Sequence, residues 1–126
     1  MILIADSGST KTDWALLHSI NPRVGNEVIA TFHTQGITPI HQTPDIIRHI
    51  IGQELMSQLS SFPRAQLIKS SSRVLESPLL SNIKVFFYGS GCTPAHVPMM
   101  KQMLARIWGC HSRKCYRDVR SCCLRV

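Results

Sequence analysis

In the first third of the chain, short apolar runs alternate with turn residues, which predicts strands. Residues 1–5 are apolar, include two isoleucines and run into small polar residues, a pattern typical of a buried strand. Residues 12–17 and 27–34 carry further apolar and β-branched side chains, and breaks at residues 21–22 and at Gly36 bound the second of these runs. Together the three runs predict an antiparallel meander.

A helical period follows. Thr43, Pro44 and Asp45 supply an N-cap, a proline for the first turn and an acid at the positive end of the helix. The apolar residues after them fall on one stripe: Ile46, Ile47, Ile50, Ile51 and Leu55. This pattern predicts a helix that ends near Leu59.

The last third predicts one more strand and one more helix. Residues 83–88 are rich in β-branched and aromatic side chains and end at the glycine turn 89–91. Thr93 and Pro94 repeat the cap and proline, and apolar residues follow at helical spacing: Val97, Met100, Leu104, Ile107 and Trp108. The predicted element order is βββαβα, so the predicted fold class is α/β.

Length and composition bound the function classes. A chain of 126 residues suffices for one domain but not for a two-lobed enzyme, and its 44% apolar residues argue against disorder. No apolar run approaches the roughly 20 residues that cross a bilayer, and the start lacks the basic segment of a signal peptide. We expect a cytoplasmic protein without a membrane partner.

The net charge of +7 is unevenly distributed. Residues 110–126 hold five basic residues against the single acid Asp118, and four of the five cysteines. We therefore divide the chain into a body, residues 1–109, and an atypical Cys/Arg-rich tail, residues 110–126, which we expect to be disordered or frameshifted.

The composition of the tail allows three explanations. A zinc site is disfavoured because the tail has no C-x-x-C pair. A basic tail that binds nucleic acid has one aromatic residue for stacking, Tyr116. A shifted reading frame is preferred, because codons for Cys-Cys-Leu-Arg, moved by one base, can read Ala-Ala-Cys-Gly, which suits an alanine-rich helix.

The polar turn after the first predicted strand carries the candidate chemistry. It contains a carboxylate, a glycine, hydroxyl groups and a lysine, in the order Asp6, Gly8, Ser9, Thr10, Lys11 and Thr12. Backbone N–H groups near a glycine and hydroxyl donors bind phosphate well. Asp6 would repel bare phosphate, so a divalent cation, most suitably Mg²⁺, is expected between them.

Two other interpretations of this turn compete with a phosphate site. A Walker loop is excluded because no glycine immediately precedes Lys11 and a strand, not a helix, is predicted after the turn. An ordinary polar hairpin turn with a solvated Lys11 stays open on the residues alone. The histidines, His33 among them, show no paired spacing and are expected to be structural.

Residues 2–14 resemble the first phosphate motif of the actin/hexokinase-like fold. Within that fold they are similar to the BadF/BadG/BcrA/BcrD-type ATPase family, which includes N-acetylglucosamine kinases. Residues 87–92 resemble the strand-end glycine turn of the same proteins. The resemblance covers about residues 1–109 and implies a partial ribonuclease-H-like N-terminal lobe of an actin-like ATPase.

The resemblance implies use of ATP and Mg²⁺, with Asp6 at the metal and residues 8–12 at the phosphates. Gly36 and Thr38 lie where these kinases contact an amino sugar, although the family has an asparagine in place of Thr38. The family's catalytic aspartate has no counterpart after Cys92, so no catalytic residue is assigned. We expect an N-terminal portion that is inactive alone, from a family whose full-length members form homodimers. The alternative is a small non-catalytic module whose tail binds nucleic acid.

Overall fold

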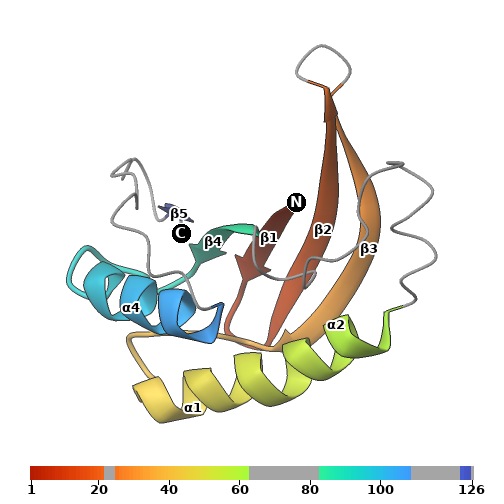
Figure 1. The fold of residues 1–126 in the computed structure, drawn as a ribbon. Coiled ribbons are helices and arrows are strands. Elements are labelled where there is room, and N and C mark those ends of the chain that lie inside the picture. Colours follow the sequence, from red (N-terminus) through yellow and green to blue (C-terminus); the bar gives the residue numbers. More distant parts are fainter. Residues whose placement is uncertain (22–24, 63–82, 109–122, 126) are drawn as a thin grey trace.

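The computed structural model describes residues 1–21, 25–62, 83–108 and 123–125. Three strands come first: β1 (Ile2–Ser7), β2 (Lys11–Asn21) and β3 (Gly25–Gln35). A helical segment follows, made of α1 (Pro44–His49), η1 (Ile50–Leu55) and α2 (Met56–Ser61). Then come β4 (Lys84–Gly89), α4 (Val97–Ile107) and β5 (Cys123–Arg125), so the mixed α/β class predicted from the sequence is confirmed (Figure 1).

The strands form one sheet in the order β3-β2-β1-β4-β5. β1 pairs antiparallel with β2 and parallel with β4, so the ends of β1 and β4 lie at the same edge of the sheet. β2 and β3 form the predicted antiparallel hairpin. This topology brings the two glycine-containing turns, after β1 and after β4, side by side.

One face of the sheet is covered by both helical segments (Figure 1). The core residues of that face include Leu3, Trp14 and Phe87, and they pack with Ile51 of η1 and Leu104 of α4. Side chains alternate along a strand, so the next residues in each strand lie on the opposite face. The alternation in β1 is visible in its burial, because Leu3, Ala5 and Ser7 are buried and Asp6 is exposed.

The helical segment also covers the edge of the sheet. The Gln58 amide donates to the carbonyl oxygen of His33 at 2.7 Å and accepts from its N–H at 3.4 Å. Glu54, four residues earlier, accepts from the backbone N–H of Gln35 at 2.8 Å. These two side chains bind backbone groups that an edge strand would otherwise leave open to another chain.

Two helix predictions need correction. The apolar stripe predicted one uniform helix, but its middle, η1, is a π-helix, and Ile46 is 48% exposed although it was placed on the buried stripe. The second helix begins at Val97 rather than at Pro94. Pro98 explains this shift, since a proline lacks an N–H group and fits only in the first turn of a helix.

Strand β5 lies within the tail, where no strand was predicted, and it pairs antiparallel with β4. The rest of the tail, residues 110–122 and 126, lies outside the described residues. Every cysteine of the tail except Cys123 and every basic residue of the tail except Arg125 falls there, so the zinc-site and nucleic-acid explanations lie outside the described residues. Across the described ranges, no helix is both long and apolar enough to cross a bilayer.

Candidate functional site

A cavity of about 620 Å³ lies where β1 and β4 end. Its lining residues come from the end of β1 and the following turn, the start of β2, and the end of β4 with the residue after it: Asp6, Ser7, Gly8, Thr10, Lys11, Asp13, Tyr88, Gly89 and Ser90. Four of the six candidate residues of the polar turn, Asp6, Gly8, Thr10 and Lys11, therefore share this cavity. Ser9 is exposed at the turn but outside the lining.

Strand register places a row of polar side chains on the exposed face of the sheet. Asp6 lies opposite Asp13 of β2 and Tyr88 of β4, and Asp13 lies opposite His33 of β3. Residues opposite one another in a sheet project from the same face. The row therefore runs across four strands in the order Tyr88, Asp6, Asp13 and His33.

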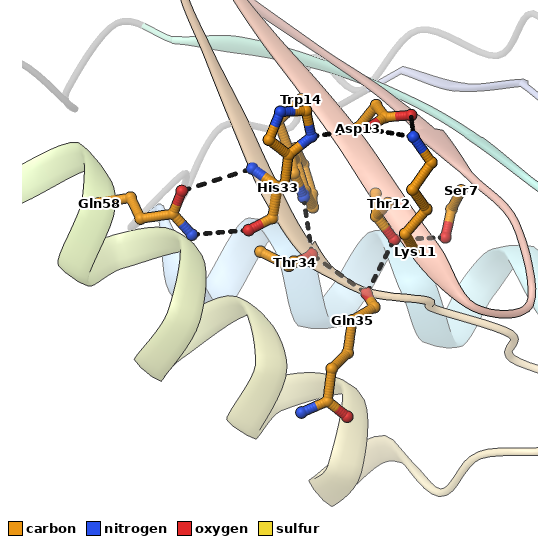
Figure 2. Close-up of polar contacts among 9 residues, drawn as sticks. All are labelled: Ser7, Lys11, Thr12, Asp13, Trp14, His33, Thr34, Gln35 and Gln58. Carbon is orange, nitrogen blue, oxygen red and sulfur yellow. Dashed lines mark hydrogen bonds and ion pairs between the residues drawn. The ribbon is translucent and has the colours of Figure 1, made fainter.

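Asp13 is the charged centre of this row (Figure 2). Lys11 Nζ lies 2.9 Å from Asp13 Oδ2, and His33 Nδ1 lies 2.6 Å from Asp13 Oδ1. The hydrogen bond from Lys11, and then the one with His33, lowers the pKa of the Asp13 carboxyl below its ordinary value. Asp6 has no such cationic partner among the described residues, so its carboxylate is the one left to meet a cation.

The backbone N–H groups of the turn differ in their hydrogen bonds. The N–H of Gly8 closes the turn by donating to the Lys11 carbonyl oxygen at 2.9 Å. No hydrogen bond of the Ser9 or Thr10 N–H group is found among the described residues. Successive N–H groups in a turn can form a concave anion site, which makes this turn a candidate for one.

Thr12 occupies a different environment from the rest of the predicted site. Its side chain is fully buried, on the face opposite Asp6. Thr12 Oγ1 lies 2.6 Å from Ser7 Oγ and donates to the Gln35 carbonyl oxygen at 3.0 Å. The hydroxyl is thus occupied by the chain itself and points away from the cavity.

Gly36 and Thr38, the predicted acceptor-contacting residues, do not line the cavity. Gly36 lies directly against the turn, because a Cβ built on it would come within 2.5 Å of the Ser9 carbonyl carbon and oxygen. Thr38 is buried, and its Cγ2 would meet a Cβ at Gly91 at 3.1 Å. Gly91 has φ of +76°, so the glycine is required there by both backbone conformation and space.

The sequence did not single out Asp13, His33, Tyr88 or Ser90 as site residues. A signal existed for the last two, because neighbouring parallel strands deliver their carboxyl-terminal turns to one edge of a sheet. Asp13 and His33 are twenty residues apart, and only the register of β2 and β3 brings them together.

The site residues fit a magnesium–phosphate ligand. In the described part of the chain, no three His, Cys, Asp or Glu side chains gather to hold a metal ion unaided. Mg²⁺ is commonly held by one or two carboxylates together with substrate phosphates and water. Of the two carboxylates at the cavity, Asp13 is paired with Lys11 and His33, and Asp6 has no cationic partner among the described residues. Asp6, beside the Ser9 and Thr10 N–H groups without a described partner, matches that arrangement.

Comparison with known proteins adds one line of evidence. The chain matches no protein-family model, and no match was found among curated proteins. Among solved structures, it is similar to a putative N-acetylglucosamine kinase from Porphyromonas gingivalis, with a TM-score of 0.64 and 32% sequence identity. The match covers 86% of this chain and 31% of that protein, so the chain spans about a third of the length of its structural neighbour.

Proposed function

We propose that this chain forms the phosphate-binding part of an ATP-dependent sugar kinase of the BadF/BadG/BcrA/BcrD type. The observation that carries the proposal is the exposed Asp6 carboxylate beside the turn whose Ser9 and Thr10 N–H groups have no described partner. The similarity to a putative N-acetylglucosamine kinase supports a nucleotide as ligand and an amino sugar as acceptor. The architecture assigned by this proposal is the partial lobe of an actin-like ATPase.

In this proposal Asp6 would hold the Mg²⁺ of a magnesium nucleotide, partly through water. The ion would neutralise phosphate charge and hold the phosphates in one orientation. The chain's own contribution is binding: the Ser9 and Thr10 N–H groups and the Thr10 hydroxyl donate to phosphate oxygens. Lys11 adds positive charge to the cavity lining, and its ion pair with Asp13 partly neutralises that charge.

A binding experiment tests this assignment. Mg²⁺ and tripolyphosphate, titrated together into the 126-residue chain, should give saturable heat that needs both components. Asp6→Asn should weaken this binding by about 10–100-fold, which is the loss of metal affinity expected when a group that contacts the metal through its ligands is removed. Asp45→Asn is the matched control, since Asp45 is an exposed aspartate of α1 whose partner is Arg48. Equal affinity of the wild type and Asp6→Asn would refute the assignment.

We further propose that the chain alone binds but does not turn over substrate. Phosphoryl transfer depends on positioning the nucleotide and the acceptor hydroxyl together, and this chain matches only 31% of its structural neighbour. ADP release should therefore stay at background when ATP, Mg²⁺ and N-acetylglucosamine are added. Turnover of ~10 s⁻¹, which is typical of enzymes, would overturn this part of the proposal if it were abolished in Asp6→Ala.

A further inference from the structure

We propose that Ser7 and Thr12 are positioning residues that lock the anion-binding turn, residues 8–11, onto the loop that follows β3. This inference rests on the proposed function, because it takes the turn as the phosphate site. Both side chains are buried, with Ser7 3% and Thr12 0% exposed. They lie opposite one another in the β1–β2 register and project from the helix-covered face.

The two hydroxyls contact backbone groups at the end of β3 and in the loop after it. Ser7 Oγ accepts from the N–H of Ile37 at 2.9 Å and lies 3.0 Å from its carbonyl oxygen. Thr12 Oγ1 donates to the Gln35 carbonyl oxygen at 3.0 Å. Gln35 is the last residue of β3 and Ile37 lies beyond it, so these backbone groups stand where the strand ends, and buried backbone groups without partners are costly. The two hydroxyls therefore lie at the edge of the core, at the point where the chain leaves β3.

Gly36 holds the turn from the loop side. Its N–H donates to the Thr10 carbonyl oxygen at 3.1 Å, and its Cα lies so close to Ser9 that no Cβ fits. The end of β3 and the loop after it thus contact the turn at its tip through Gly36 and at its base through Ser7 and Thr12. A shift of the turn peptides requires a shift of the loop.

This attachment matters because the proposed anion site is made largely of backbone N–H groups. Such groups bind well only when they already point at the ligand, since their direction cannot be adjusted by rotating a side chain. The same loop continues into Thr38, whose N–H donates to the side chain of Gln42 at 2.8 Å. Turn and loop therefore form one unit, and the buried hydroxyls set the direction of the turn's N–H groups.

The chain offers a matched control for Thr12 in Thr34 (Figure 2). Thr34 is buried on the same face, and its hydroxyl donates to the same Gln35 carbonyl oxygen at 3.1 Å. Its other described hydrogen bond comes from Trp14 Nε1, and none joins it to residues 8–11. Thr12→Val and Thr34→Val each remove one buried hydroxyl and keep the shape, so a purely structural role predicts equal effects on binding.

The experiment measures affinity for tripolyphosphate with Mg²⁺ in the full chain, together with amide hydrogen exchange at Gly8 and Gly36. Thr12→Val should weaken binding about 5–10-fold and speed exchange at both amides, whereas Thr34→Val should change neither. Thr12→Ser, which restores a hydroxyl, should recover wild-type affinity. Equal affinity and equal exchange in Thr12→Val and Thr34→Val would overturn the inference.

Two further outcomes keep this inference separate from the proposed function. If the wild type binds no tripolyphosphate but Thr12→Val still speeds exchange at Gly8 and Gly36, the proposed function fails and the locking role stands. If Thr12→Val does not fold, Ser7→Ala takes its place, because it removes the partner hydroxyl from the same cluster. Unchanged affinity and exchange in a folded Ser7→Ala would then count against the inference.

Discussion

At the end of the sheet that borders the cavity, one face contacts the rest of the chain and the other is exposed, although neighbouring residues of the same strands form both faces. Ser7 and Thr12 face the core, and their described hydrogen bonds join parts of the chain to one another. Asp6 is exposed at the cavity wall, and Asp13 stands opposite it on the same face. The comparison teaches that a contiguous motif contains residues of two kinds, those that hold the turn and those that meet a ligand.

The largest effect should come from the core face. Trp14 is 1% exposed, donates to Thr34 Oγ1 at 3.0 Å and packs at 6.3 Å, centroid to centroid, from Phe87. Trp14→Ala should lower the free energy of unfolding by about 3–5 kcal/mol, measured by urea denaturation. Val28→Ala, at a 55% exposed position, is the control and should change it by less than about 0.5 kcal/mol. If Trp14→Ala lowered the free energy of unfolding by less than about 0.5 kcal/mol, this face of the sheet would not be the core.

A smaller effect on the free energy of unfolding is expected at Gly36, where the loop after β3 packs against the turn. Gly36→Ala would force a Cβ against Ser9, so we expect a loss of about 1–3 kcal/mol and weaker tripolyphosphate binding. Gly52→Ala is the control: a Cβ there has nothing within 4 Å, and alanine favours a helix by roughly 0.5–1 kcal/mol. If both variants were equally stable and bound alike, the turn and the loop would not be in tight contact.

On the exposed face, a substitution should raise stability instead of lowering it. Asp6 lies directly opposite Asp13, and like charges in that arrangement destabilise a sheet. Asp6→Asn should therefore raise the thermal midpoint by roughly 1–2 °C at low salt while it weakens tripolyphosphate binding. Salt should reduce the gain, because exposed charges are screened. A clear loss of stability would show that Asp6 supports the fold.

The smallest effect concerns pH. Lys11 and His33 lower the pKa of Asp13 in the folded chain, so the charged carboxylate is favoured by folding. Its stabilisation is present above the ordinary aspartate pKa of about 3.9 and is lost as pH falls through the lower folded value. Asp13→Asn should remove this contribution, and the midpoint should then fall less steeply below pH 4 than in the wild type. Parallel curves for the two proteins would refute the ion-pair assignment.

Much of the fold could be predicted from local pattern. The runs 1–5, 12–17, 27–34 and 83–88 are strands in the structure, and Thr43 caps the first helix by accepting from the N–H of Ile46. These features depend on residues within a few positions of one another. The π-helical stretch, the start of α4 at Val97 and the pairing of β5 with β4 were not predicted. Of these, only the α4 start had a local signal, Pro98.

The candidate site divides in the same way. The sequence by itself determined which residues form the turn, and that Asp6 immediately precedes it, because a carboxylate, a glycine and hydroxyls in series are a local property. Only the tertiary structure decided that Thr12 is buried against Gln35, that Gly36 touches Ser9, and that Asp13 joins His33. Those contacts span about 20 to 30 residues and depend on strand register, where a slip of one residue would exchange the two faces of the sheet.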